Sequence, residues 1–167
     1  GKVIGRDSEN MYSSMGGILG EASGAHQLSY EILKECVHAY NGRIDKSDLY
    51  FEIIGELTEL EFFRRLMREG FDPFPGYAPR VFEYAAKGDN LARNAVITTA
   101  SEHAEDVIAI ARKLNLEGPL VVVCSVGLHT SKSELFTTVF QNRVSQAFQN
   151  VRFNVLDVPP VVGAVAH

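Results

Sequence analysis

Leu120-Val121-Val122-Val123-Cys124 is a continuous apolar run that directly follows Gly118-Pro119. A run of mostly β-branched residues bounded by turn formers is typical of a strand that is buried on both faces of a parallel sheet. A helix is predicted to follow from Ser131-Lys132-Ser133-Glu134, a Ser-x-x-Glu capping box, to about Gln149. Residues 151–156 predict a second strand. A strand, a crossover helix and a strand indicate a parallel pair with a right-handed connection.

The remainder of the chain is predicted to be a hairpin followed by helices. Residues 2–5 and 11–15 form the two arms of the expected hairpin, with a cluster of turn formers between them. Capping residues, glycine stops and apolar periodicity predict helices over residues 23–40, 47–57, 58–70, 77–87 and 90–116, and a short buried helix begun by proline over 159–166. This order predicts an α/β fold in which a mixed sheet carries a large helical insertion.

Composition excludes several classes of partner. The chain has 167 residues, with 16 Lys and Arg against 21 Asp and Glu, and a formal net charge of −5. No basic run stands out, so we expect no nucleic-acid partner. The longest apolar stretch lies around residues 119–124, far short of the roughly 20 residues that a membrane span needs, so we expect no membrane partner. A chain of this size hides roughly 70% of its unfolded surface on folding, enough for one domain.

Two cysteines, Cys36 and Cys124, are too few for a disulfide framework and lack zinc-binding spacing. We therefore expect a reduced, cytoplasmic setting. Cys36 lies in the apolar stripe of the first helix with Leu28, Ile32, Leu33 and Tyr40, which predicts a small buried side chain. The chain opens at Gly1 directly in a predicted strand, and we expect it to be a piece of a longer protein.

The turn Ser125-Val126-Gly127-Leu128-His129-Thr130-Ser131 is the first candidate binding site. It follows a buried strand and leads into a helix, which is where ligands collect in open α/β sheets. Small residues there would let a nucleotide approach the backbone. The alternative interpretation is an ordinary strand-to-helix connection that needs a glycine.

Gly16-Gly17 and Gly20-Glu21-Ala22-Ser23-Gly24 form a second small-residue loop before a helix. Its backbone amides could bind a hydroxylated or anionic ligand. The alternative is a plain glycine-rich connector in which Glu21 favours the helix dipole, because no Walker-type phosphate loop is present.

The histidines are not expected to assemble into a site. His26 and His38 are too far apart along one helix to chelate together. His129 either contacts a ligand or fills the turn. His103 is expected to be a hydrogen-bonded core histidine, on the apolar face of the longest helix that also carries Val96, Ala100, Val107, Ile110 and Leu114.

Several segments, in order, resemble one family. Residues 16–24, Gly-Gly-Ile-Leu-Gly-Glu-Ala-Ser-Gly, are similar to the Gly-Gly-Trp-Gly-x-Leu-Leu-Gly-Asp-Glu-Gly-Ser-Gly segment of the BadF/BadG/BcrA/BcrD ATPase and N-acetylglucosamine kinase family. Residues 3–10 resemble its hairpin with Gly-Arg-Asp at the turn, and residues 78–89 its Ala-Pro-x-Val-Phe-x-x-Ala-x-x-Gly-Asp stretch. Residues 121–127 resemble its adenosine motif, and Pro160-Val161-Val162-Gly163-Ala164 its closing Pro-x-x-Gly-Ala helix. The resemblance covers nearly the whole chain.

The resemblance implies the ribonuclease H-like fold of actin, sugar kinases and Hsp70. Residues 1–167 would be a single C-terminal lobe, and the N-terminal lobe, with its phosphate loop and catalytic aspartate, is absent. The longer protein would transfer the γ-phosphoryl group of ATP, with Mg²⁺, to a sugar or amino-sugar hydroxyl. The fragment alone is expected to be inactive. Its expected partners are ATP, the sugar, the missing lobe and, in a homodimer, a second copy.

The resemblance also implies which residues bind. Nucleotide-binding residues would be Ser125, Val126, Gly127, His129, Thr130 and Gly163. Acceptor-binding residues would be Gly17, Gly20, Glu21 and Ser23. No catalytic residue and no metal ligand is assigned to this lobe.

The chain also departs from the family. It lacks the family's tryptophan, and Glu21-Ala22-Ser23 shortens the acidic run that borders the sugar in these kinases. Two alternatives therefore stay open: a BadF-type ATPase, and a non-catalytic pseudokinase module that senses a nucleotide or sugar. The iron–sulfur activators of the same family are disfavoured, because neither Cys36 nor Cys124 matches their cysteine spacing.

Overall fold

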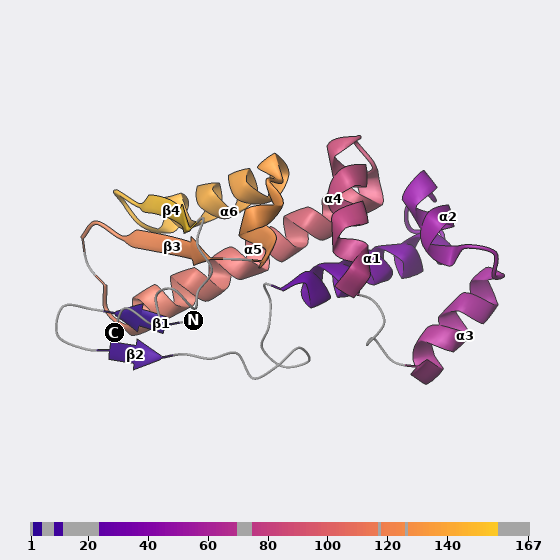
Figure 1. Cartoon of the computed structure of the whole chain (residues 1–167), viewed down its shortest axis with the longest axis horizontal. Helices are drawn as coiled ribbons and strands as arrows, with labels where there is room; N and C mark the ends of the chain where they lie inside the picture. The colour runs from indigo at the N-terminus through magenta and orange to yellow at the C-terminus, as the bar shows by residue number, and fades with distance from the viewer. Residues whose placement is uncertain are drawn as a thin grey trace. The chain divides into compact units, whose positions relative to one another are not determined.

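The computed structural model describes residues 2–4, 9–11, 24–69, 75–116, 118–125 and 127–156. The chain divides into two compact units. The helical unit is Ala25–Thr99, and the sheet unit combines Gly1–Gly24 with Ala100–His167. Helices predominate and the described strands form two small pairs, one of them parallel, which makes this an α/β fold (Figure 1).

Helices fill the chain between the two strand pairs, as the sequence predicts. Each predicted helix up to residue 116 is present, with its ends shifted by at most a few residues. They are α1 (Ala25–Tyr40), α2 (Asp48–Ile54), α3 (Glu59–Glu69), α4 (Ala78–Ala86) and α5 (Asn90–Lys113), with a 3₁₀ turn, η1 (Pro75–Tyr77), before α4. The predicted helical insertion is therefore confirmed as a set of helices.

Local side-chain hydrogen bonds set several helix ends. Thr58 and Glu61 form the predicted capping box: the Thr58 N–H donates to Glu61 Oε2 (3.0 Å), and the Glu61 N–H donates to Thr58 Oγ1 (3.3 Å). The Ser47 hydroxyl accepts from the Tyr50 N–H at the start of α2. After α1 and α4, Gly42 and Gly88 have φ angles of 72° and 93°, the left-handed backbone that ends a helix.

The buried stripe of α1 is confirmed at four of its five predicted positions. Leu28, Ile32, Leu33 and Cys36 are almost fully buried, whereas Tyr40 is 40% exposed. Cys36 is thus the small core residue that was expected.

The predicted apolar face of α5 is only partly correct. Val96 and Ala100 are buried, but His103, Val107, Ile110 and Leu114 are half-exposed. The buried line continues instead through Ala104, Ile108 and Ala111. Alanines let neighbouring elements approach the helix closely, and two of the three residues that continue the buried line are alanines.

The predicted parallel pair is confirmed in the sheet unit. Strand β3 (Val121–Ser125) pairs in parallel with β4 (Arg152–Leu156), from Val121 opposite Arg152 to Ser125 opposite Leu156. Between them lie a 3₁₀ turn, η2 (Gly127–Ser131), and the helix α6 (Glu134–Ala147). The rings of Phe140 in α6 and Phe153 in β4 lie 5.8 Å apart, so α6 covers one face of the pair (Figure 1).

The prediction that β3 is buried on both faces is wrong. Val121 is 53% and Val123 54% exposed, and Leu156, on the same face, is 38% exposed. Side chains alternate between the faces of a strand, and α6 covers only the face that carries Phe153. An apolar run shows that a strand has side chains suited to burial. Whether both of its faces are buried depends on which other elements of the chain pack against them.

The start of α6 also differs from its prediction. Ser133 caps the helix, because its hydroxyl accepts from the Phe136 N–H (3.3 Å). Ser131, the predicted cap, lies in η2 and donates its hydroxyl to the Leu128 carbonyl (2.5 Å). Lys132 between them has a φ of 58°, and this left-handed residue turns the chain out of η2 before α6 begins.

The predicted hairpin is confirmed as an antiparallel pair of β1 (Lys2–Ile4) and β2 (Glu9–Met11). The second arm starts two residues earlier than predicted, because Glu9 and Asn10 join the ladder. The rest of that arm, residues 12–15, and the helix predicted over 159–166 lie outside the described residues. No described helix combines the length and the apolar character needed to cross a membrane.

Candidate functional site

The predicted nucleotide turn lies at the carboxyl end of β3. Ser125 is the last residue of the strand, and Gly127, His129 and Thr130 follow in η2. Gly127 has a φ of 66°, which favours glycine, and a Cβ built there would meet nothing within 4 Å. Four of the six predicted nucleotide-binding residues therefore lie together on one short segment. Val126 and Gly163 lie outside the described residues.

The predicted acceptor loop cannot be placed in the same way. Gly17, Gly20, Glu21 and Ser23 all lie outside the described residues. Their role toward a sugar stays a prediction.

His129 lies against His103 of α5, although the sequence predicted that the histidines stay apart. Their Nε2 atoms are 2.9 Å apart, within hydrogen-bond distance. His103 stacks on the ring of Phe140 (centroids 5.0 Å apart, planes at 22°), and His129 meets Phe140 and Phe136 edge-on. We call these four side chains the histidine box. The expectation that His103 is hydrogen-bonded is confirmed, but its side chain is half-buried and not part of the core.

Burial keeps both imidazoles of the histidine box neutral at pH 7. Burial, together with the neighbouring His129, lowers the pKa of His103 from 6.5 to about 4. Burial also lowers the pKa of His129. Two neutral imidazoles can share one hydrogen bond, in which one Nε2 donates and the other accepts.

The other ring nitrogen of His103 decides which histidine donates. Its Nδ1 is buried and has no hydrogen-bond partner in the part of the chain that the structure describes. A buried N–H without an acceptor is rarer and costlier than an unused lone pair. We therefore assign the His103 proton to Nε2, which donates to Nε2 of His129, and the His129 proton to Nδ1.

The turn does not fit a magnesium ion by itself. Residues 125–131 contain no carboxylate, and Mg²⁺ prefers oxygen ligands with at least one carboxylate or phosphate. Across the described ranges, no three His, Cys, Asp or Glu side chains come together in a way that could hold a metal ion. The open space beside Gly127 leaves room for a ligand at the backbone of the turn.

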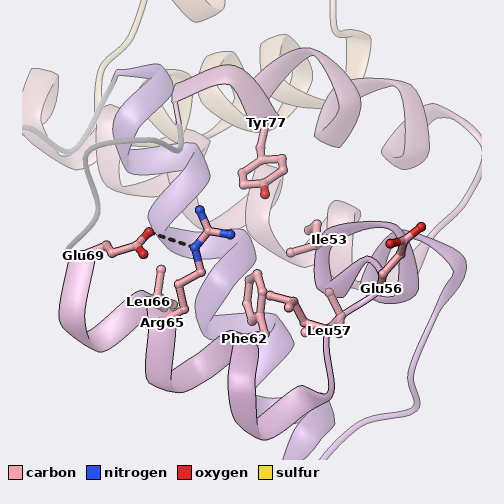
Figure 2. A pocket seen from close by; sticks show the side chains of 9 residues that line it. Ile53, Glu56, Leu57, Phe62, Arg65, Leu66, Glu69 and Tyr77 are labelled. Atoms are coloured by element: carbon pink, nitrogen blue, oxygen red, sulfur yellow. Dashed lines mark hydrogen bonds and ion pairs between the residues drawn. The ribbon is translucent and has the colours of Figure 1, made fainter.

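The helical unit contains a hollow of about 460 Å³ between α2, α3 and η1. Figure 2 shows the Tyr77 ring on one side and Phe62 and Leu66 on the other. The Arg65 side chain at the edge donates from Nε to Glu69 Oε2 (2.8 Å), so its charge is already paired. The walls are otherwise mainly aliphatic, formed by Ile53, Ile54 and Leu57, with Glu56 at the rim. This lining holds no nucleophile paired with a base.

Sequence reasoning missed two parts of these sites. Phe136 and Phe140, four residues apart on a predicted helix, are the kind of pair that could have indicated one wall of the histidine box. The contact between His103 and His129 had no signal in the sequence, because 26 residues of chain separate them.

Comparison of the chain with models of known protein families gave no match, and comparison with curated proteins gave none either. A function for the chain therefore has to be inferred from the geometry of the turn and from the sequence motifs.

Proposed function

We propose that the chain is the nucleotide-binding lobe of an ATP-dependent kinase that phosphorylates a hydroxyl of a sugar or amino sugar. In this proposal a second lobe supplies the catalytic residues, and the whole protein works in the cytoplasm. The observation that carries the proposal is the glycine turn η2 at the carboxyl end of β3, inside a parallel β3–α6–β4 unit.

The chemistry of the turn supports a nucleotide. Parallel strands place the turns at their carboxyl ends beside helix N-termini, whose backbone N–H groups have no partner within the helix. Here that helix is α6, fourteen residues long, with Ser133 as its cap. Gly127 has space around it, so a ligand is able to approach the backbone of η2. The other sequence segments that resemble the kinase family, and their order along the chain, also support the proposal.

We include in the same proposal that the chain has the fold of an actin-like lobe. In an actin-like lobe the pairs β1–β2 and β3–β4 would be parts of one mixed sheet. The lobe would hold the adenosine and part of the acceptor, while Mg²⁺ would come with the phosphates. Phosphoryl transfer needs positioning and charge neutralisation more than covalent chemistry, so this lobe would act by holding its ligands in place.

Binding is tested by titrating the isotope-labelled chain with MgATP and following its amide resonances. We expect shifts concentrated in residues 125–131 and the first turn of α6, and none around the hollow in the helical unit. Gly127→Val should weaken binding strongly. Gly76→Val, a glycine change in the other unit with open space and no positive φ, should leave binding unchanged. The absence of shifts at millimolar MgATP would overturn the proposal.

Catalysis is tested in the longer protein that we propose, with ATP labelled at its γ-phosphate. We expect transfer of the label to N-acetylglucosamine or a related sugar. Phosphate release that needs no acceptor would instead indicate a BadF-type ATPase. Nucleotide binding without transfer or release would indicate a sensing module.

A further inference from the structure

We propose that His103 and His129 form a proton-operated latch, which holds the turn η2 against α5 near neutral pH and releases it in acid. The latch is a single hydrogen bond between two imidazoles inside the histidine box. It joins a residue of α5 to the middle of η2, where Leu128 is also buried, at 4% exposed. The inference concerns the turn itself and does not rest on the proposed kinase function.

The tautomers explain why a proton opens the latch. In the closed pair the His103 Nε2–H donates to Nε2 of His129, so the lone pair on that nitrogen is in use. His129 can accept a proton on Nε2 only by giving up this hydrogen bond. The remaining lone pair is on Nδ1 of His103, which is buried without a partner. A proton there would create a charge with no acceptor for the new N–H.

Among the described residues, the groups seen to pack against the pair are aromatic rings, which do not compensate such a charge. The helix α6 presents the phenyl rings of Phe136 and Phe140 to it. On α5, the carboxyls nearest to His103 in sequence are Glu102 and Asp106, and both residues are exposed. The strand that leads into η2, β3, carries the buried thiol of Cys124, which burial keeps protonated by raising its pKa. Aromatic faces attract a cation weakly, so leaving the box for water is the better outcome for a protonated imidazole.

The direction of the pH effect follows from which state binds more protons. With the latch closed, the pKa of His103 is about 4, whereas an exposed imidazole has its ordinary value of 6.5. Between these values the open turn binds more protons than the closed one. For each imidazole that takes up a proton on opening, opening should therefore become up to about tenfold more favourable for each unit by which the pH falls. Above pH 6.5 opening should not depend on pH.

The test is amide hydrogen exchange of residues 127–131 in the whole chain, corrected for the intrinsic pH dependence of exchange. From neutral pH down to about pH 5, we expect opening to increase as the pH falls, by up to about tenfold per unit for each of the two imidazoles. His129→Phe keeps a ring in the box but cannot take a proton, so the pH dependence of opening should fall to the part that His103 contributes. His38→Gln removes a half-buried histidine of α1, paired with Glu35, and should leave the dependence unchanged.

Two further measurements test the latch even if the His129→Phe variant does not fold. His103→Phe removes the other half of the pair and should likewise reduce the pH dependence of opening, to the part that His129 contributes. In the unaltered chain, nitrogen spectra of the imidazoles should show the proton of His103 on Nε2 and that of His129 on Nδ1. Opening that is independent of pH, or two imidazoles that both titrate near pH 6.5, would overturn the latch.

Discussion

Arg80 of α4 donates two parallel hydrogen bonds to Glu52 of α2, from Nε to Oε1 and from Nη2 to Oε2, both at 2.7 Å. The Tyr84 hydroxyl donates to the same Oε2 at 2.6 Å. These contacts lower the pKa of Glu52, chiefly through the hydrogen bonds from Arg80 and Tyr84. A fork of this kind needs the planar guanidinium, because an ammonium group cannot match both carboxylate oxygens.

Arg80→Lys should therefore lower the melting temperature of the chain slightly, although the positive charge is kept. The effect should be small because both side chains are well exposed, at 46% and 37%, and water screens them. It should shrink further at high salt. Thermal unfolding at low and high salt measures both effects. Arg143→Lys is the control, since Arg143 meets Glu105 through Nε and no fork is present. If Arg80→Lys lowered the melting temperature more at high salt than at low salt, the ion pair would not explain the effect.

The same pair predicts a dependence on pH. The pKa of Glu52 lies below its ordinary value of 4.5 in the folded chain. The contribution of ionised Glu52 to the stability of the fold is therefore present at neutral pH and decreases as the pH falls below 4.5. Glu52→Gln should remove this acid-sensitive part of the stability. Unfolding curves of the two chains should therefore converge in acid.

The start of α6 can be tested at Ser133. Ser133→Ala removes the acceptor for the Phe136 N–H and should destabilise the chain by about 1 kcal/mol. Ser133→Asp keeps an acceptor and adds a charge that favours a helix N-terminus, so it should restore the loss. Urea unfolding measures both. Equal stability of Ser133→Ala and the unaltered chain would place the cap elsewhere.

Gly127→Ala should destabilise the chain by about 1 kcal/mol, because its φ of 66° is unfavourable for any residue with a Cβ. Gly76→Ala is a matched control, since Gly76 has no positive φ and a Cβ there would also meet open space. The difference between the two variants isolates backbone strain from steric contact. Urea unfolding of both variants provides the measurement.

Cys36 should be inert in the folded chain. It is fully buried, and burial, with the charges of Asp89 and Glu35, raises its pKa to about 12. Because the thiolate is the reactive form, a thiol reagent at neutral pH should label Cys36 only as fast as the chain opens. In denaturant both Cys36 and Cys124 should react at once. Immediate reaction of Cys36 in the native chain would contradict its position in the core.

Local signals in the sequence predicted local structure well. The helix ends at Thr58 and Gly42 need only neighbours a few residues away, so the pattern contains all the information. The parallel pairing of β3 and β4 was also predictable, because a strand, a helix and a strand leave few arrangements.

Features that depend on distant parts of the chain were not predictable. Whether Val121 and Val123 are covered depends on what lies over their face, and the apolar run contains no information on this. The contact between His103 and His129 arises from the way α5 meets η2. The error at Ser131 is local instead, because the left-handed residue that follows it, Lys132, moved the helix start to Ser133.

The parallel arrangement of β3 and β4 also matters while the chain is being made. Val121 pairs with Arg152, so β3 leaves the ribosome well before its partner exists. A hairpin would pair within a few residues, but here η2 and α6 must be synthesised first. During that interval residues 120–124 form an unpaired apolar segment without charges. Segments of this kind tend to associate with other chains. Slow translation after residue 125, or loss of a holding chaperone, should therefore lower the yield of native protein more than its final stability suggests.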